Sequence, residues 1–307
     1  MKRIKLVIIL GPTAAGKSRI ALGLAERFNG EIISADSRQV YKLMDIGTAK
    51  PSATEQKRIK HHLIDLIYPD DIFDAARYRK EATEAIEDIV RRGKSIIVVG
   101  GTGLYIKVLI RGIFKGPKAD IKLREKLKKE AEVFGDTYLY KRLKEIDPPM
   151  AQKIHIHDMF RIIRALEVYQ ITGKPLSKFQ QEHNFCDNPY EVLKIGIGNE
   201  RESLYLKINK RVNEMIEDGL VDEVRALLKR GYGPGLKAMQ TFGYKQICDY
   251  VLNGVNFDES VKLTKQDTRR YAKRQITWFK RDGEIAWFNP DEEKNMFQLT
   301  SDFFYSK

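Results

Sequence analysis

Residues 11–18 read Gly11-Pro-Thr-Ala-Ala-Gly-Lys17-Ser18, between the apolar stretch Lys5–Leu10 and the amphipathic stretch Arg19–Phe28. This spacing matches the phosphate-binding P-loop, in which glycines let backbone N–H groups turn inward toward phosphate oxygens. The lysine of such a loop reaches phosphate oxygens, and the serine hydroxyl holds Mg²⁺. The positive end of the following helix dipole adds to the attraction. The motif therefore predicts a site for a polyphosphate or a diphosphate, and it leaves the chemistry open.

The composition points to a globular protein with a polyanionic partner. The chain has 307 residues, 42% of them hydrophobic, which is enough for one large or two modest domains. Lys and Arg exceed Asp and Glu by 55 to 42, a formal charge of +13. A nucleic-acid partner explains such an excess because binding phosphates releases counterions, although solubility alone is an alternative explanation.

Two cysteines, Cys186 and Cys248, lie far apart and form no C-x-x-C motif. A cysteine zinc site is therefore not encoded, and reduced thiols are expected. The basic start followed by an apolar run resembles a signal peptide, but the run leads directly into the P-loop without a cleavage site. No stretch is long and apolar enough to cross a membrane, so we expect a cytoplasmic protein.

Strand and helix patterns alternate along the first part of the chain. This alternation predicts an α/β fold, with a parallel sheet flanked by helices as in P-loop NTPases. The expected strands are Lys5–Leu10, Glu31–Ser34, His62–Ile67, Ser95–Val99, Leu193–Gly198 and, at an edge, Ile285–Phe288. The expected helices of the core are Lys17–Phe28, Asp74–Arg92, Gly103–Arg111, Ser203–Asp218, Val221–Lys229, Tyr244–Leu252 and Asp258–Lys280.

Between these parts the pattern is only helical. Helices are expected at Ile121–Val133, Thr137–Ile146 and Asp158–Thr172, with a short one opened by Pro148 and Pro149. We therefore predict an inserted all-helical domain at residues 117–189, interrupting a catalytic core formed by residues 1–116 and 190–307.

Two segments that follow core strands can carry chemistry. Asp36 comes just after the second strand, and in a parallel sheet it should lie beside the P-loop. A carboxylate there can bind Mg²⁺ or act as a general base, although a turn or helix N-cap aspartate is the alternative. Gly100-Gly-Thr102-Gly103 follows the strand expected at Ser95–Val99, where a nucleotide-hydrolysing P-loop protein usually has an aspartate. This difference counts against ATP or GTP hydrolysis.

Basic side chains recur at helical spacing in two places. Arg161 and Arg164 share one helix face, and a longer stripe runs through the last long helix at Lys262, Lys265, Arg269 and Lys273. The same helix carries aromatic residues that could stack on bases, at Tyr271, Trp278 and Phe279. A solvated helix with core aromatics is the alternative. His61 and His62 lack a third residue at metal-ligand spacing, and we interpret them as structural.

Further segments resemble the bacterial tRNA dimethylallyltransferases, also called tRNA isopentenyltransferases. Besides the P-loop, the matching segments are Asp36-Ser37 with Tyr41, Met44–Pro51, Val99–Tyr105, Arg161–Val168, Gly243-Tyr244 and Lys273–Trp278. They occur in order over nearly the whole chain. Bacterial members of this family lack a C-terminal zinc finger, which agrees with the cysteine count.

The resemblance implies a reaction and its partners. A dimethylallyl group would pass from dimethylallyl diphosphate to the exocyclic amine of the adenosine directly 3′ of the anticodon. The acceptors would be tRNAs that read codons beginning with U, held by the anticodon stem-loop. The P-loop would hold the diphosphate leaving group with Mg²⁺ near Ser18, so no water-activating aspartate is needed. We expect a monomer that binds no membrane.

Residue roles follow from the same resemblance. The implied catalytic residues are Asp36 as the base, with Thr13, Thr102 and Arg211. The implied diphosphate-binding residues are Gly11, Pro12, Thr13, Ala14, Ala15, Gly16, Lys17 and Ser18. The implied tRNA-binding residues are Asp36, Ser37, Arg38, Gln39, Thr102, Arg124, Phe160, Arg161, Arg164, Gln240, Thr241, Phe242, Gly243, Tyr244, Lys245, Lys273, Arg274, Gln275, Trp278 and Lys280.

Three other functions fit parts of the sequence. A P-loop small-molecule kinase would hold ATP in the loop and use Asp36 to activate a hydroxyl, but the charge and the lack of an Arg-rich lid disfavour it. Prenylation of free adenine nucleotides would not need the basic helical insertion. A non-catalytic RNA-binding protein could use the P-loop as a switch, and transfer activity would distinguish it.

Overall fold

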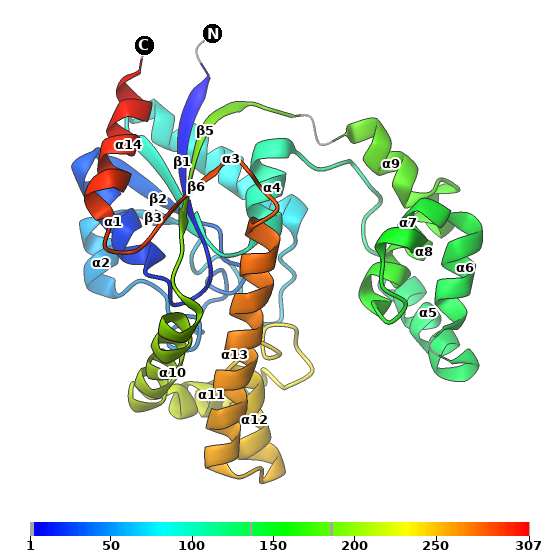
Figure 1. Cartoon of the computed structure of the whole chain (residues 1–307). Coiled ribbons are helices and arrows are strands. Elements are labelled where there is room, and N and C mark those ends of the chain that lie inside the picture. The colour runs from blue at the N-terminus through cyan, green and yellow to red at the C-terminus, as the bar shows by residue number, and fades with distance from the viewer. Residues whose placement is uncertain (1–2, 136, 185–186, 307) are drawn as a thin grey trace. The chain divides into compact units, whose positions relative to one another are not determined.

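A computed structural model describes residues 3–135, 137–184 and 187–306 (Figure 1). The chain folds as two compact units, one formed by Met1–Ile110 with Asn188–Lys307 and the other by Arg111–Asp187. The boundaries expected from the sequence, at residues 117 and 189, differ from these by a few residues. Cys186 lies outside the described residues, whereas Cys248 is a free, buried thiol.

The first unit is built on a six-stranded sheet in the order β3-β2-β4-β1-β5-β6, and every pairing is parallel. The strands are β1 (Ile4–Leu10), β2 (Gly30–Ser34), β3 (His61–His62), β4 (Ser95–Gly100), β5 (Tyr190–Ile197) and β6 (Ile285–Phe288). Because all strands run the same way, their carboxyl ends lie at one edge. The loops that carry the candidate site leave the sheet there.

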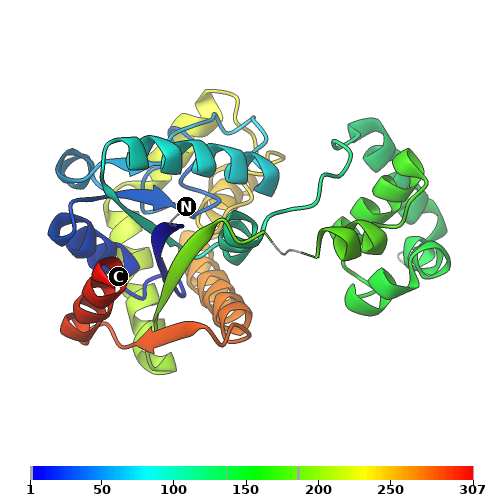
Figure 2. The same ribbon diagram turned by 90° about the horizontal axis from the view of Figure 1, so that it is seen from above.

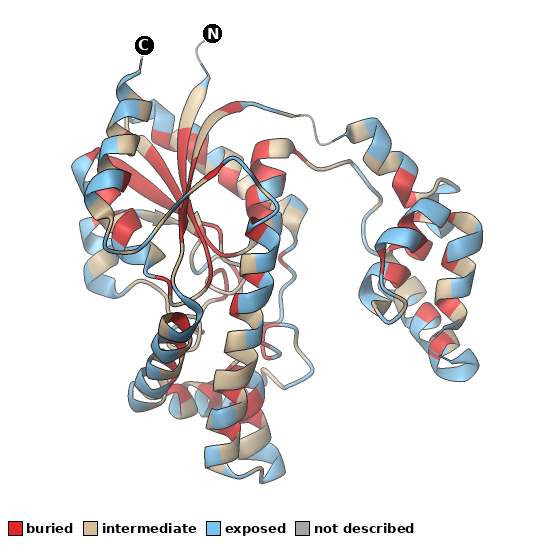
Figure 3. Cartoon of the chain, in the orientation of Figure 1, coloured by how far each residue is buried: buried red, intermediate tan, exposed pale blue. Residues whose placement is uncertain are grey.

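Helices cover both faces of the sheet (Figure 2). The helices of this unit are α1 (Lys17–Arg27), α2 (Ala53–Arg58), α3 (Ala75–Arg91), α4 (Gly103–Arg111), α10 (Arg201–Glu217), α11 (Leu220–Lys229), α12 (Tyr244–Asn253), α13 (Phe257–Phe279) and α14 (Glu293–Tyr305). Ile20 and Leu24 of α1 and Met296 of α14 pack on one face against Val7 and Ile9 of β1. The central strand is buried on both faces, as its continuous Val/Ile/Leu run requires (Figure 3).

Helices α10–α13 extend beyond the carboxyl edge of the sheet (Figure 1). Leu204 and Ile208 of α10 pack against Ala272 of α13 and form a small core of their own. Since α13 runs back to the sheet, its second half reaches the P-loop while its first half packs on α12. This extension forms the far side of the candidate site.

The second unit contains only helices in its described part. They are α5 (Ile121–Phe134), α6 (Tyr138–Ile146), α7 (Pro148–Lys153), α8 (Met159–Thr172) and α9 (Leu176–His183). Leu127, Leu139, Leu143, Ile162 and Leu166 form its core. The P-loop NTPase-like α/β core with an all-helical insertion, as predicted from the sequence, is the fold observed.

Several expected elements differ from the structure. The strand expected at His62–Ile67 is wrong, because β3 ends at His62 and the chain turns through positive φ at Leu63 and Asp65. The amides that follow bond to Gln39 and Val40 instead of extending the ladder. Helices α2 and α14 were not predicted. Among the described residues, no helix combines the length and the apolar character that a membrane crossing needs.

Candidate active site

The P-loop leaves β1 and enters α1 at the carboxyl edge of the sheet. Gly11 has φ +138°, and a Cβ there would lie 2.6 Å from the carbonyl oxygen of Ile197 in β5, so only glycine fits this turn. Ala14 and Gly16 also have positive φ, which curls the backbone before α1 begins at Lys17. The first N–H groups of α1 have no partner within the helix and lie at its positive end. The loop is therefore shaped to receive an anion.

The Lys17 ammonium group donates to the Pro12 carbonyl oxygen at 2.6 Å and so folds back over its own loop. Burial and the nearby Arg211 guanidinium lower the pKa of Lys17 to about 8, with the Asp36 carboxylate opposing part of this effect. Burial likewise lowers the pKa of Arg211, again opposed by Asp36. Two desolvated cations thus lie near each other, and an anion between them would relieve their repulsion.

Asp36 lies two residues beyond β2, and its Oδ1 accepts the backbone N–H of Arg38 at 2.8 Å. Thr102, from the turn after β4, accepts the Ser37 amide at 3.1 Å and also shares a hydrogen bond with Tyr271 of α13. Burial, reinforced by the charge of Asp36, raises the pKa of Tyr271 to about 12, so this hydroxyl keeps its proton. The Asp36 carboxylate is held in a fixed orientation.

Asp36, Arg211 and Tyr271 line one cavity of about 290 Å³, whereas Lys17 and the predicted Thr102 are not among its lining residues. Its lining residues are Thr13, Ala14, Asp36, Ser37, Arg38, Gly47, Thr48, Ile208, Arg211, Val212, Met215, Thr241, Phe242, Thr264, Thr268, Tyr271 and Arg274. The structure therefore brings together the predicted Thr13, Asp36 and Arg211 from three distant parts of the chain. Thr13 and Asp36 come from loops at the sheet edge, whereas α10 supplies Arg211 together with the apolar side chains Ile208, Val212 and Met215.

Gln275 of α13 ties two loops of the sheet edge together. Its Oε1 accepts the Thr13 amide at 2.9 Å, and its Nε2 donates to the Gly101 carbonyl oxygen at 3.0 Å. A Cβ on Gly101 would lie 2.0 Å from that Nε2, which explains the glycine. The protein's own helix α13 thus approaches the Gly-rich turn closely. Gln275 is buried, which corrects its prediction as an RNA-contacting side chain.

Tyr244 requires a second correction. Its side chain is completely buried, and its hydroxyl donates to Glu223 at 2.5 Å, so its ring cannot contact RNA. Its predicted neighbours Thr241 and Gly243 are buried as well. Gln240 and Lys245 are exposed, and the half-buried Phe242 lines the cavity. Most of the segment Gln240–Lys245 therefore packs inside the protein beside the cavity, and only its two end residues face solvent.

Helix α13 presents part of the predicted basic stripe to solvent. Lys273, Arg274 and Lys280 are exposed, and the Trp278 side chain is 42% exposed. Arg269, in contrast, donates to Asn209 at 2.6 Å and is half-buried. A second hollow of about 520 Å³ lies next to Pro12, and its lining includes Lys273 and Lys280. The exposed cations lie near the P-loop.

The predicted RNA-binding residues of the second unit, on α5 and α8, are of two kinds. Arg161 and Phe160 face solvent, the phenyl ring being 71% exposed. Arg164 and Arg124 instead pair with Glu167, which is completely buried, at 2.5 and 2.8 Å. The same carboxylate accepts the Asp120 amide at 2.8 Å, and these bonds hold the pKa of Glu167 below its usual range. Arg124 and Arg164 thus stabilise this unit from within, a role the sequence did not reveal.

Some lining residues were missed by sequence reasoning. Gly47 and Thr48 belong to the segment that carried the family resemblance, yet no role was inferred for them. Ile208, Val212 and Met215 recur at the spacing of one helix face, which alone could not distinguish a cavity wall from ordinary core packing. His62 pairs with the buried Glu31 at 2.7 Å, in agreement with a structural role for that histidine.

The donor set fits Mg²⁺ that arrives together with a diphosphate. The described residues contain no group of three His, Cys, Asp or Glu side chains placed to hold a metal. Oxygen donors at the P-loop and the cavity include the Ser18 hydroxyl at the start of α1 and the Asp36 carboxylate. Mg²⁺ commonly uses one or two protein oxygens, with substrate phosphates and water completing its octahedron. Ser18 with a bound diphosphate would satisfy this requirement.

Comparisons with known proteins give a consistent result. The family model for IPP transferase matches residues 39–282. The tRNA dimethylallyltransferase 2 of Geotalea uraniireducens is 53% identical over 93% of this chain and 92% of its own length. The tRNA dimethylallyltransferase of Caldanaerobacter subterraneus is 50% identical over 98% of this chain and 96% of its own.

Solved structures agree with this family. The crystal structure of a full-length tRNA isopentenylpyrophosphate transferase from Bacillus halodurans superposes with a TM-score of 0.73 at 38% identity, covering 97% of this chain and 96% of that one. A eukaryotic dimethylallyltransferase seen acting on tRNA superposes with a TM-score of 0.85 at 29% identity, over 99% of this chain and 80% of that one. On the family model and these relatives together, the chain belongs to the IPP transferase family.

Proposed function

We propose that this protein transfers the dimethylallyl group of dimethylallyl diphosphate to the exocyclic amine of an adenosine in tRNA, releasing diphosphate. The adenosine is the one 3′-adjacent to the anticodon in tRNAs that read codons beginning with U. The observation that carries the proposal is the cavity in which the P-loop residue Thr13, the carboxylate of Asp36 and the guanidinium of Arg211 meet apolar side chains of α10. A cytoplasmic location and action as a monomer accord with this role.

The P-loop side of the cavity stabilises the leaving group. As the allylic carbon–oxygen bond breaks, negative charge grows on the diphosphate. The amides at the start of α1, Lys17 and Arg211 would stabilise this charge. Lys17 would turn from the Pro12 carbonyl oxygen toward the phosphate oxygens. Mg²⁺, when bound with the diphosphate near Ser18, would supply further charge neutralisation.

Asp36 acts as the general base for the adenine amine. The amine must lose a proton as it attacks the allylic carbon, and a carboxylate within about 3 Å can accept it. The Arg38 amide fixes one carboxylate oxygen at 2.8 Å, which orients the group toward the cavity it lines. Tyr271 lines the cavity beside Asp36 and would position the acceptor, and Thr102 supports this arrangement through its hydrogen bonds to the Ser37 amide and to Tyr271.

The apolar side chains of the cavity explain why the transferred group is a hydrocarbon. Ile208, Val212 and Met215 cannot hydrogen-bond a sugar or a polar acceptor, whereas a branched five-carbon chain gains free energy when it leaves water and packs against them. A kinase would place a hydroxyl-bearing substrate at this position. The lining therefore favours prenyl transfer over phosphoryl transfer.

The acceptor is recognised by surface charge and by access to its base. Lys273, Arg274 and Lys280 on α13 would neutralise phosphates of the anticodon stem-loop, and Trp278 offers a partly exposed ring for stacking. On the second unit, Arg161 and Phe160 provide a cation and an aromatic surface of the same kind. The target adenosine must leave its stack to reach the cavity, at a cost of a few kcal/mol.

A transfer assay tests this function. The purified protein is incubated with Mg²⁺, labelled dimethylallyl diphosphate and unmodified tRNA carrying adenosine 3′ of the anticodon. We expect label in that adenosine and none when guanosine replaces it or when AMP replaces the tRNA. Label on AMP, or phosphate transfer from ATP to a small molecule, would contradict the proposal.

A further inference from the structure

The segment Met44–Lys50, after β2, separates two hollows of the first unit. Gly47 and Thr48 line the active-site cavity of about 290 Å³. Asp45, Ala49 and Lys50 line a neighbouring hollow of about 530 Å³. Arg211 and Met215 of α10 border both. The position of this segment therefore sets how far the active-site cavity extends.

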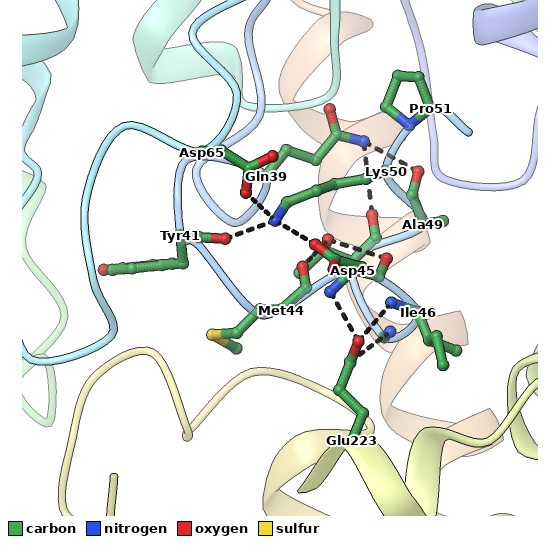
Figure 4. Close-up of polar contacts among 12 residues, drawn as sticks. Gln39, Tyr41, Met44, Asp45, Ile46, Ala49, Lys50, Pro51, Asp65 and Glu223 are labelled. Atoms are coloured by element: carbon green, nitrogen blue, oxygen red, sulfur yellow. Dashed lines mark hydrogen bonds and ion pairs between the residues drawn. The ribbon is translucent and has the colours of Figure 1, made fainter. Parts of the chain in front are cut away.

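Glu223 of α11 holds the segment through its backbone. Its carboxylate accepts three consecutive amides, those of Asp45 and Ile46 at 2.8 and 2.9 Å and that of Gly47 at 3.3 Å (Figure 4). The Tyr244 hydroxyl donates a fourth bond at 2.5 Å. Burial and the nearby Glu223 raise the pKa of Tyr244 well above its ordinary value, so the phenol stays a donor. The carboxylate is enclosed by donors in the way a bound anion is.

Two further side chains tie down the other end of the segment. The Lys50 ammonium group, whose side chain is only 4% exposed, donates to the Tyr41 carbonyl oxygen, to Asp45 and to Asp65 at 2.5–2.6 Å (Figure 4). The Gln39 amide donates to the carbonyl oxygens of Thr48 and Ala49. All of these bonds are made within the protein.

Gly47 allows the segment to lie flat on its support. A Cβ at Gly47 would lie 2.4 Å from the ring of Tyr244 and 2.9 Å from Leu220, which no side chain tolerates without displacement. Tyr244 thus has two roles: its hydroxyl donates to Glu223, and its ring is the surface against which the segment packs. Any change that pushes the backbone off this ring moves Gly47 and Thr48 at the cavity wall.

We propose that Glu223 is a positioning residue that limits the length of the prenyl donor by fixing the wall between the active-site cavity and the neighbouring hollow. With the wall in place, the carbon chain of the donor is confined between Gly47–Thr48 and the apolar face of α10. With the wall loosened, the two hollows join and a longer chain fits. This inference rests on the proposed function, because it assigns the cavity to an allylic diphosphate.

The test compares dimethylallyl diphosphate with geranyl diphosphate, which carries five more carbons, on one tRNA. Glu223→Gln removes the negative charge and turns an N–H group toward the backbone amides. We expect kcat/KM for the dimethylallyl donor to fall on the order of tenfold, the effect of a lost charge-assisted bond. The ratio of kcat/KM for dimethylallyl diphosphate to kcat/KM for geranyl diphosphate should fall by a similar factor. The affinity for tRNA should not change.

Three further variants make the result decisive. Asp222→Asn changes the neighbouring carboxylate, which is 82% exposed and pairs only locally with Arg225, so it should match the wild type. Gly47→Ala displaces the segment but leaves the Glu223 side chain unmutated, and it should also lower the ratio of kcat/KM for the dimethylallyl donor to that for the geranyl donor. Tyr244→Phe removes one of four donors and should give a smaller change of the same kind, which keeps the test available if Glu223→Gln does not fold.

The outcomes separate the two proposals. If the wild-type protein transfers no prenyl group to tRNA, the proposed function fails. If the wild type is active while the folded variants at positions 223, 47 and 244 keep its donor preference, the proposed function stands and the role of Glu223 is refuted. Loss of activity with an unchanged preference would also refute it, because a merely structural role predicts that result.

Discussion

Two loops at the carboxyl edge of the sheet enclose an anion site in backbone amides, and they use it differently. In the segment Met44–Lys50 the site is filled by Glu223 from the protein's own helix α11. In the P-loop, Gly11–Ser18, the site faces the α1 N-terminus and the active-site cavity. The first arrangement supports structure, and the second is prepared for a ligand.

The lysines of the two loops show the same contrast. Lys50 has two aspartate partners, whereas Lys17 has no carboxylate within ion-pair distance among the residues that the structure describes. Burial and Arg211 lower the pKa of Lys17 to about 8. A half-buried lysine that has no carboxylate within ion-pair distance indicates where an anionic ligand can bring compensating charge.

The largest expected effect concerns the chemistry beside the P-loop. Asp36→Asn keeps an acceptor for the Arg38 amide but removes the base, so kcat should fall by about 10²–10⁴. Single-turnover transfer to tRNA measures it, with tRNA affinity as the control. A variant with wild-type kcat would show that the carboxylate only shapes its loop.

Replacing each of the two lysines by methionine tests directly whether one serves ligand binding and the other serves stability. Lys17→Met should lower kcat/KM for the donor by about 10²-fold, the scale of one lost transition-state contact, while thermal stability stays near that of the wild type. Lys50→Met should instead cost about 1–3 kcal/mol of unfolding free energy, because two aspartates and a carbonyl lose their donor. Equal effects of both variants on stability and on turnover would show that the two lysines do not have different roles.

The pH dependence of kcat/KM for the prenyl donor tests the role of Lys17 further. The lowered pKa of Lys17 means that the ammonium group is charged below about pH 8 and loses its proton above it. In the proposed function the charged form binds the diphosphate, so kcat/KM for the donor should fall by up to about tenfold per unit as pH rises past 8. Lys17→Arg keeps the charge and should abolish this fall. A decline that persists in Lys17→Arg would have to come from another group.

The smallest effect is expected at the surface. Lys273 on α13 is exposed, and its replacement by alanine should weaken tRNA binding severalfold and reduce the salt slope by about one. Turnover of bound tRNA should stay unchanged. An unaltered slope in a binding titration from low to high salt would remove Lys273 from the RNA interface.

The sequence predicted those features whose signal is local. The P-loop, the parallel strands and Asp36 follow from short patterns, and the structure places Thr13, Asp36 and Arg211 on one cavity as expected. The turn after His62 was predicted as a strand because its apolar residues resemble one, while the positive φ of Leu63 and Asp65 depends on bonds to the distant Gln39 and Val40.

Roles that depend on distant partners could not be predicted. Glu223 and Tyr244 lie on α11 and α12, and nothing in their neighbourhood shows that both reach the segment after β2. Arg124 and Arg164 are cations of the kind found on RNA-binding surfaces, yet both form ion pairs with the buried Glu167. A charge pattern gives the position of a cation along the chain and not the partner that the fold provides.

The most direct test is the binding of diphosphate with Mg²⁺ by calorimetry, in the absence of tRNA, to the wild type and to Lys17→Met, Lys50→Met and Glu223→Gln. The account predicts that Lys17→Met alone loses binding, while the other two variants keep it if they are folded. Binding that survives in Lys17→Met but is lost in folded Glu223→Gln would show that the anion occupies the other loop, and would contradict the assignment of the P-loop to the leaving group.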